Sequence, residues 1–277
     1  MGDLSIVTEN LSDDAIARAF RVIQISDSHL LRDGNDLLKG VATWRTFQSV
    51  VERITQEDPR PDLVVATGDL AHDGSSSVYR RLREHLARIE APVCVLPGNH
   101  DDPVLLAKAF GIDTEEDMTE GASGMSFGHA NLANWLIVFL NTVAPGEQYG
   151  ILGERELTRL STLLRNHPNR HTLLCLHHHA IPRSNEIPNF PGLRDAERFL
   201  SIVDRHPQVR GVIWGHIHDI FEAKRKDTVF FGTPSTCFQF GMALGKVSLS
   251  DAPPAYRRLT LKFDGMIESE VVRLTGC

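Results

Sequence analysis

The sequence predicts an α/β fold with two packed sheets and helices on their outer faces. Short apolar runs of strand length alternate with amphipathic runs of helix length through the first two-thirds of the chain. The C-terminal part instead has two strand-like runs around a tight turn signal. No linker or internal repeat interrupts the pattern, and 277 residues suffice for one large domain. We therefore expect a single domain over residues 21–277, preceded by an N-terminal extension over residues 1–20.

Strands and helices alternate in the first part of the chain. An amphipathic stretch places Phe47, Val51 and Ile54 at helical spacing, and Ser75 is a capping residue before a second such stretch. The predicted elements are strands over 21–26, 62–67 and 91–96 and helices over 43–54 and 75–89. Because strands joined through helices pair in parallel, this alternation predicts right-handed βαβ units.

The second part continues the alternation and then changes character. Pro168 ends one amphipathic run, and Asp195 stands where a capping residue would begin the next. The predicted elements are strands over 134–141, 172–176, 211–214 and 228–231 and helices over 154–168 and 195–207. Beyond them, Asp264 and Gly265 lie between two strand-like runs, which predicts an antiparallel hairpin.

Charge and composition argue against several classes of partner. The net charge is −7 and no run of Lys and Arg stands out, so we expect no nucleic-acid and no membrane partner. The N-terminus lacks a signal-peptide pattern, and no apolar run approaches the ~18 residues that cross a bilayer. The four cysteines (Cys94, Cys175, Cys237 and Cys277) have no paired spacing, so we expect reduced thiols and a cytoplasmic location.

Five apolar runs each end in a short polar cluster. The clusters are Asp27 with His29, Gly68 with Asp69, Gly98 to Asp101, His177 to His179, and Gly215 with His216 and His218. Because the carboxyl ends of parallel strands share one sheet edge, where ligands bind, we expect the clusters to converge. In extended backbone, each of the i, i+2 pairs would point two side chains the same way.

The residue types in these clusters are metal ligands. Carboxylate, imidazole and amide groups without thiolate suit manganese, iron or zinc. Seven such ligands are too many for one tetrahedral ion and suit two ions that share a carboxylate. Ions about 3.5–4 Å apart clamp a phosphoryl group and acidify a bridging water. The clusters therefore predict a binuclear site for displacement at phosphorus.

The ordered set DSH (27–29), GD (68–69), GNHD (98–101), HHH (177–179) and GHIH (215–218) resembles the calcineurin-like metallophosphoesterases. The stretches VATGDLAHDGSSSVYRRL and TPSTCFQF (233–240) are similar to those of the bacterial class III 3′,5′-cyclic AMP phosphodiesterases. The resemblance implies a four-layer α-β-β-α sandwich. It also implies two divalent or trivalent metal ions per chain, as iron, manganese or zinc, with manganese activating.

The resemblance also implies roles for individual residues. One ion would be held by Asp27, His29, Asp69 and His218, and the other by Asp69, Asn99, His177 and His216. His100 would be the catalytic residue that stabilises or protonates the leaving oxygen, with Asp101 supporting the site from behind. The implied substrate-binding residues are Asn99, His100 and His218.

The implied reaction is hydrolysis of 3′,5′-cyclic AMP to 5′-AMP by attack of a metal-bound hydroxide. The partner is then a cyclic nucleotide, and a homodimer is left open. The alternatives are a broader phosphodiesterase acting on 2′,3′-cyclic nucleotides or glycerophosphodiesters, a nuclease, and a metal-bound scaffold without catalysis. Three histidines in or beside the motifs have no role among these. His72 is interpreted as a solvated loop residue, and extended backbone would place His179 beside His177 with His178 opposite.

Overall fold

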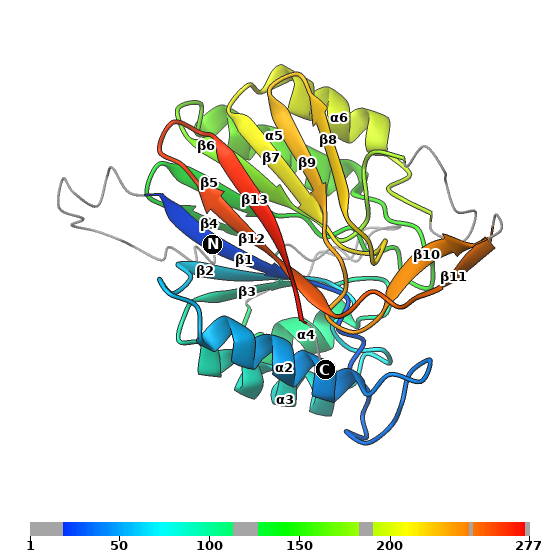
Figure 1. Cartoon of the computed structure of the whole chain (residues 1–277). Helices are drawn as coiled ribbons and strands as arrows, with labels where there is room; N and C mark the ends of the chain where they lie inside the picture. The colour runs from blue at the N-terminus through cyan, green and yellow to red at the C-terminus, as the bar shows by residue number, and fades with distance from the viewer. Residues whose placement is uncertain (1–18, 113–126, 183–190, 244–245, 275–277) are drawn as a thin grey trace.

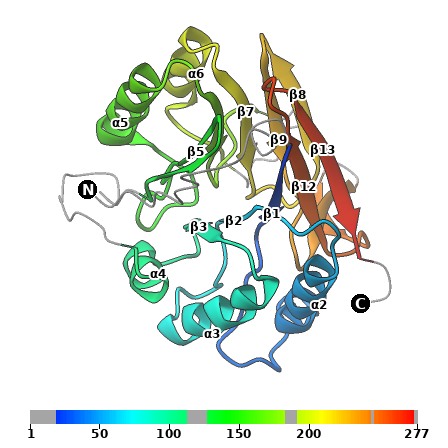
Figure 2. The ribbon, with the colours of Figure 1, turned by 90° about the vertical axis from the view of Figure 1, so that its left-hand side faces the viewer.

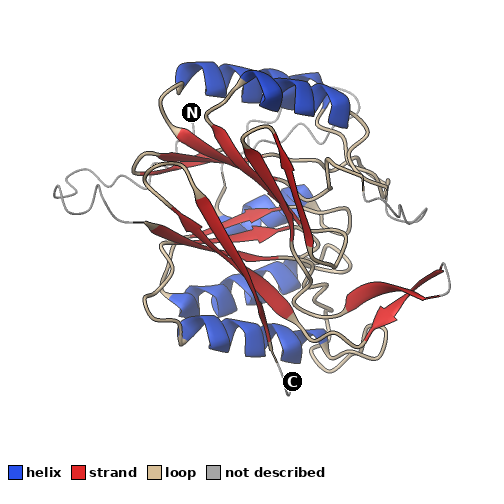
Figure 3. Ribbon diagram, turned by 45° about the horizontal axis from the view of Figure 1, so that its top comes forward, coloured by secondary structure: helices blue, strands red, loops and turns tan. Residues whose placement is uncertain are grey.

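Two mixed sheets face each other, and helices cover the outer side of each sheet (Figure 3). The computed structural model describes residues 19–112, 127–182, 191–243 and 246–274. The sequence of layers is helix, sheet, sheet, helix, which confirms the predicted α/β class with two mixed sheets flanked by helices. None of the helices in the described residues combines the length and the apolar character needed to cross a membrane.

The first sheet has the strand order β13-β12-β1-β2-β3 (Figure 1). Its strands are β1 (Phe20–Ile25), β2 (Leu63–Thr67), β3 (Val93–Leu96), β12 (Ala255–Leu261) and β13 (Ile267–Arg273). The strands β1, β2 and β3 pair in parallel, whereas β12 pairs antiparallel with β1 and β13. The helices beside this sheet are α2 (Thr43–Thr55), α3 (Ser76–Leu86) with the short η1 (Ala87–Ile89), and α4 (Pro103–Phe110) (Figure 2).

The second sheet has the strand order β4-β5-β6-β7-β9-β8. Its strands are β4 (His129–Leu132), β5 (Trp135–Phe139), β6 (His171–Cys175), β7 (Val209–Trp214), β8 (Phe221–Arg225) and β9 (Thr228–Gly232). The strands β5, β6, β7 and β9 run parallel, and the covering helices are α5 (Gly153–Asn166) and α6 (Ala196–Arg205) (Figure 2). A separate ribbon of β10 (Gln239–Ala243) and β11 (Lys246–Ser250) extends from the body (Figure 1).

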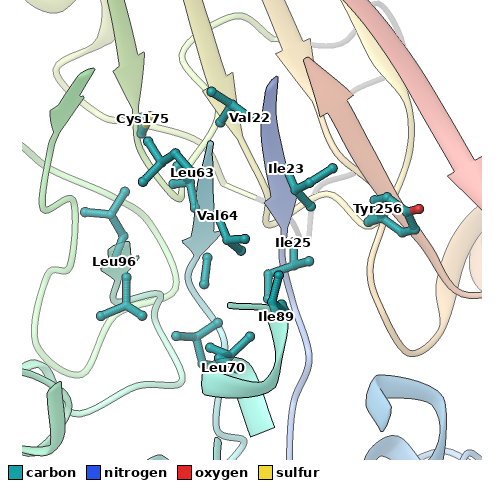
Figure 4. Close-up of a cluster of buried hydrophobic side chains, with 14 of the residues drawn as sticks. Val22, Ile23, Ile25, Leu63, Val64, Leu70, Ile89, Leu96, Cys175 and Tyr256 are labelled. Atoms are coloured by element: carbon teal, nitrogen blue, oxygen red, sulfur yellow. The ribbon is translucent and has the colours of Figure 1, made fainter. Parts of the chain in front are cut away.

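Apolar side chains form two cores. The larger core joins the two sheets to α2, α3 and α4, and Ile23, Ile25 and Val64 lie at its centre (Figure 4). The smaller core joins the second sheet to α5 and α6 through residues such as Leu160 and Phe199. Burial of apolar surface on both faces of each sheet makes the strand frame rigid, so the loops at the strand ends start from fixed positions.

A buried polar link fixes the two sheets to each other next to the strand ends. The Gln24 side-chain amide, on β1, donates to the Thr67 hydroxyl at 2.9 Å and to the Trp214 carbonyl oxygen at 3.1 Å. Its oxygen accepts from the Thr233 hydroxyl at 2.6 Å. Because Thr67 and Trp214 end strands of different sheets, this amide holds the carboxyl ends of β2 and β7 together.

The predicted elements are present, and the differences have local causes. The strands β4, β8, β10 and β11 and the helix α4 were not predicted. The signals for α4 are the Asp102 side chain, which accepts from the Leu105 N–H, and Pro103 in its first turn. Asp195 lies at the N-cap position of α6 as predicted, but its carboxylate accepts from the Leu152 and Gly153 N–H groups at the start of α5 and not from α6. Residues 1–18 lie outside the described residues, so the N-terminal extension stays a prediction.

Candidate metal centre and active site

The five polar clusters leave the carboxyl ends of five parallel strands. Asp27 and His29 follow β1, Asp69 follows β2, and Asn99 and His100 follow β3, all in the first sheet. His177 follows β6, and His216 and His218 follow β7, in the second sheet. The predicted ligands are buried apart from Asn99, which is half-buried, and His100 is exposed. The structure therefore brings all the predicted site residues to the edge where the sheets meet.

Several predicted ligands share a strained backbone conformation. Nine non-glycine residues of the described chain have φ in the left-handed region, and five of them are predicted ligands. These are Asp27 (φ 54°), His29 (43°), Asp69 (50°), His216 (66°) and His218 (47°). Such conformations cost energy and are retained where the surrounding structure needs them, typically at functional sites. The extended backbone expected at the two i, i+2 pairs is wrong, because all four residues have a left-handed φ.

Two glycines allow the loops to pack against the ligands. A Cβ atom on Gly98 would collide with the Asp69 side chain and backbone, and one on Gly215 would collide with Ser26 and Asp27. The His216 N–H donates to the Asp27 carboxylate at 3.0 and 3.1 Å, a contact that the small size of Gly215 permits. Gly98 and Gly215 are therefore required for the close approach of their loops to Asp69 and Asp27.

Ligand atoms gather in two groups around Asp69. In the first group, His29 Nε2 lies 3.1 Å from His218 Nε2 and 3.6 Å from Asp69 Oδ2. His218 Nε2 lies 3.4 Å from Asp27 Oδ1.

In the second group, His177 Nε2 lies 3.4 Å from Asp69 Oδ1 and 3.3 Å from Asn99 Oδ1, and the His216 ring centroid is 5.1 Å from that of His177. Asp69 thus turns one oxygen towards each group, which is the placement of a bridging carboxylate.

Backbone carbonyl groups hold three of the four histidine rings in a fixed orientation. His177 Nδ1 donates to the Thr67 oxygen at 2.8 Å, His218 Nδ1 to the Phe238 oxygen at 2.8 Å, and His216 Nε2 to the Pro191 oxygen at 3.2 Å. Because a carbonyl oxygen only accepts, the bonded ring nitrogen carries a proton, which leaves the other ring nitrogen as the position for a metal ion. Metal-binding histidines have this arrangement, so the residues present fit two metal ions.

The electrostatics of the site also fit bound cations. Burial lowers the pKa of His29 and of His216, and neighbouring histidines lower both pKa values further, so these rings are neutral. Burial opposes ionisation of Asp69, but His177 and His29 hold its pKa well below the usual value. Burial also lowers the pKa of His177, yet the Asp69 and Asp27 carboxylates raise it to about 9. The buried carboxylates therefore attract positive charge to the place where a metal ion would replace the His177 proton.

His100 is held at the mouth of the site, apart from the ligand groups. Its N–H donates to Asp69 Oδ1 at 2.9 Å, and its ring Nδ1 donates to the His72 carbonyl oxygen at 3.2 Å. The Nε2 atom therefore remains for proton exchange with a ligand. The interpretation of His72 as a solvated loop residue is wrong. It is half-buried, its ring stacks on His100 with centroids 4.7 Å apart, and burial lowers its pKa.

Asp101 connects the loops that carry Asp69 and Asn99. Its carboxylate accepts from the Gly98, Leu70 and Ala71 N–H groups at 2.9, 3.1 and 2.9 Å. The Tyr79 hydroxyl donates a fourth hydrogen bond at 2.9 Å. Burial and the charge of Asp69 raise the pKa of Asp101 to about 6, although the three N–H groups lower it. Asp101 thus sets the spacing of the two loops.

We expect Asp101→Ala to lower the free energy of unfolding by at least about 2 kcal/mol, because it leaves several buried N–H groups without a partner. It should also weaken metal binding by about 10–100-fold, as loss of a supporting group does. Tyr79→Phe is the control, since it keeps the three N–H contacts of Asp101 and removes only the hydroxyl that donates to Asp101 and accepts from the Asp102 N–H, which should cost about 1–2 kcal/mol. Urea unfolding and metal titration measure both effects. Equal losses from the two variants would contradict the role assigned to Asp101.

The three consecutive histidines differ in their surroundings. The chain bends at His177 and His178, so the extended geometry expected for them is wrong. His178 is buried, its Nδ1 lies 2.7 Å from the Thr142 hydroxyl oxygen, and its ring centroid is 4.6 Å from that of His216. The His179 ring stacks on His216 with centroids 5.9 Å apart. Both rings therefore pack around His216, while His177 alone reaches Asp69 and Asn99.

We expect His177→Ala to lose one of two bound metal ions, because His177 is the histidine in contact with both Asp69 and Asn99. His178→Ala should retain both ions, since Thr142 and His216 hold its ring beside the ligands. Elemental analysis of manganese-loaded protein after gel filtration gives the number of ions per chain. Equal metal loss from the two variants would show that His178 also binds metal, as its closeness to His177 and His216 permits.

A pocket of about 230 Å³ opens over the two ligand groups. The predicted residues in its lining are His29, Asp69, Asn99, His100, His216 and His218. Five further lining residues were not predicted to belong to the site, which are Lys39, His72, Gln148, Phe238 and Phe240. The stretch TPSTCFQF, which carried part of the family resemblance, contains the two phenylalanines and was the signal that could have found them.

The fold and this group of residues define a metal-dependent phosphoesterase, and comparison with known proteins assigns its family. The family model described as calcineurin-like phosphoesterase matches residues 20–219. The chain belongs to this family, which confirms the predicted family and its enzyme class.

Two curated relatives are each 34% identical to the chain, and both are named 3′,5′-cyclic adenosine monophosphate phosphodiesterase CpdA. The match to the Pseudomonas aeruginosa protein covers 91% of this chain and 89% of the relative. The match to the Escherichia coli K12 protein covers 98% and 94%. A solved dimetal phosphatase from Danio rerio has a TM-score of 0.58 at 14% identity and covers 92% of this chain and 99% of its own, which shows the shared fold.

Proposed function

We propose that the chain is a binuclear-metal phosphodiesterase that hydrolyses 3′,5′-cyclic AMP to 5′-AMP. The position of Asp69 carries the proposed metal chemistry, because its two oxygens face two separate groups of ligand atoms in one pocket. The two relatives named above support the substrate, since each covers nine-tenths or more of this chain. Iron, manganese or zinc would suit the donor set, and we propose manganese as an activating metal.

Seven residues would hold the two ions. Asp27, His29, Asp69 and His218 would bind one ion, and Asp69, Asn99, His177 and His216 would bind the other. When bound, the pair would neutralise charge on the phosphate and lower the pKa of a coordinated water. The neutral His29 and His216 rings and the ionised Asp69 are already in the protonation states that metal binding requires.

His100 and Asn99 would act on the substrate itself. His100 is exposed at the pocket, and its Nδ1 is fixed by the His72 carbonyl oxygen, so its Nε2 would donate a proton to the departing 3′ oxygen. The half-buried amide of Asn99 lines the same pocket and would orient a phosphate oxygen, together with His218. Lys39 lies at the rim and would add positive charge for the anionic substrate.

A substrate panel tests this proposal. Manganese-loaded protein is offered 3′,5′-cyclic AMP, 2′,3′-cyclic AMP and glycerophosphocholine at the same concentration, and the products are separated by chromatography. We expect 5′-AMP from the first compound, with kcat/KM at least about tenfold above those of the other two. A higher kcat/KM with either of the other compounds would contradict the assignment of cyclic AMP and would favour a broader phosphodiesterase. Absence of hydrolysis with all three would favour a metal-bound scaffold.

A further inference from the structure

The pocket is lined by polar and charged side chains in one part and by apolar side chains in another. The sides formed by Lys39, His72 and His100 are polar or charged. Phe238 and Phe240 are the apolar side chains in the described lining, and both lie next to the predicted metal ligand His218. Ligand pockets commonly combine one apolar surface with a few polar groups that fix orientation, and nucleobases stack on aromatic rings.

The two phenylalanines differ in what they offer to a ligand. Phe238 is only 5% exposed, because its ring is packed against His29 and His218 with centroids 5.8 and 5.0 Å apart. Phe240 is partly exposed and is the second residue of β10, in the ribbon of β10 and β11 that extends from the body (Figure 1). Its ring centroid lies 4.9 Å from that of His218 and 5.5 Å from that of Phe238. Phe238 therefore supports the ligands, and Phe240 is the partly exposed phenylalanine of the pocket lining.

Hydrogen bonds fix the position of Phe240 relative to the metal centre. The Phe240 N–H donates to the His218 carbonyl oxygen at 3.3 Å, and the His218 ring donates to the Phe238 oxygen at 2.8 Å. Two hydrogen bonds thus hold residues 238–240 to the predicted metal ligand His218. A group bound between the two ligand groups would meet Phe240 at a constant distance, as a phosphate and its attached nucleoside require.

We propose that Phe240 is the platform on which the base of a nucleotide substrate stacks, so that this residue selects nucleotide esters over other diesters. The inference rests on the proposed function and adds a specificity residue to it. The polar wall of Lys39, His72 and His100 offers no comparable apolar surface to a base. Stacking on Phe240 would place the base away from the ligands while the phosphate contacts them.

Equilibrium binding tests this platform directly. Isothermal titration of manganese-loaded protein compares 5′-AMP with ribose 5-phosphate, which has the same phosphate and sugar but no base. We expect 5′-AMP to bind the wild-type protein more tightly. Phe240→Ala should weaken 5′-AMP by at least about fivefold and leave ribose 5-phosphate unchanged. Phe240→Trp should keep the preference for 5′-AMP, because its ring also stacks.

Controls separate this inference from folding and from the proposed reaction. Phe263→Ala removes an exposed phenylalanine outside the pocket lining and should change neither affinity. Equal weakening of both compounds by Phe240→Ala would assign the residue a role in holding His218 and overturn the platform. An unchanged affinity for 5′-AMP would overturn it as well. If wild-type protein fails to hydrolyse cyclic AMP but Phe240 still selects 5′-AMP, the platform stands and the proposed substrate is wrong.

Discussion

Asp69→Ala is expected to reduce kcat for hydrolysis of cyclic AMP by at least about 10³-fold. The Asp69 oxygens face both ligand groups, so the substitution removes a shared ligand from two metal positions at once. A correctly placed ion contributes several kcal/mol of transition-state stabilisation, and each 1.4 kcal/mol is a factor of about ten in rate. The loss should appear in kcat and in metal content together, as measured by steady-state kinetics and elemental analysis.

The fold should survive this substitution. Asp69→Ala removes one hydrogen bond from the His100 N–H, and the two apolar cores are not changed. Asp73→Ala is a matched control, because Asp73 is an exposed aspartate on the same loop and should keep full activity and metal. Circular dichroism of both variants checks folding. An Asp69→Ala protein that still binds two ions with normal affinity would contradict the bridging role.

His100→Ala should lower kcat by about 10²–10⁴-fold while both metal ions remain bound, because His100 faces the pocket from outside the ligand groups. A comparison of two substrates shows whether His100 donates a proton to the leaving group. A departing 3′ oxygen needs a proton, whereas p-nitrophenolate leaves without one. The variant should therefore lose much more activity with cyclic AMP than with bis(p-nitrophenyl) phosphate.

The alternative role for His100 has a different kinetic signature. If His100 only positions Asp69 through its N–H, the Ala variant keeps that hydrogen bond and both substrates should be affected little. If His100 instead binds metal together with His29 and His72, which lie close enough to it, metal content should fall in the variant. Similar losses with the two substrates would contradict proton donation.

The sequence predicts most strands and helices well, because the buried face of an element appears in the sequence as a periodic pattern of apolar residues. Strand-length apolar runs locate the parallel strands of both sheets to within a few residues, but not β4 and β8, and the polar residues that follow five of these strands mark the shared edge. The site residues follow from this rule together with the family resemblance. Their types and order are visible in the sequence, and their convergence follows from parallel pairing.

The features of the site that the sequence does not predict depend on local backbone conformation and on contacts between distant segments. No periodic pattern reports that Asp27 or His216 adopts a left-handed conformation. His72 resembles a loop residue because its stacking on His100 joins loops after two different strands. Phe240 lies at the pocket because hydrogen bonds join residues 238 and 240, at the start of the two-stranded ribbon, to His218. Sequence spacing alone contains none of these contacts.

A crystal structure of the manganese-loaded protein with 5′-AMP, using anomalous scattering, would test the binuclear centre. We expect two anomalous peaks about 3.5–4 Å apart with the Asp69 carboxylate between them and the phosphate across both. Asp27, His29 and His218 should lie at one peak and Asn99, His177 and His216 at the other. A single peak, or two peaks that do not share Asp69, would contradict the binuclear centre.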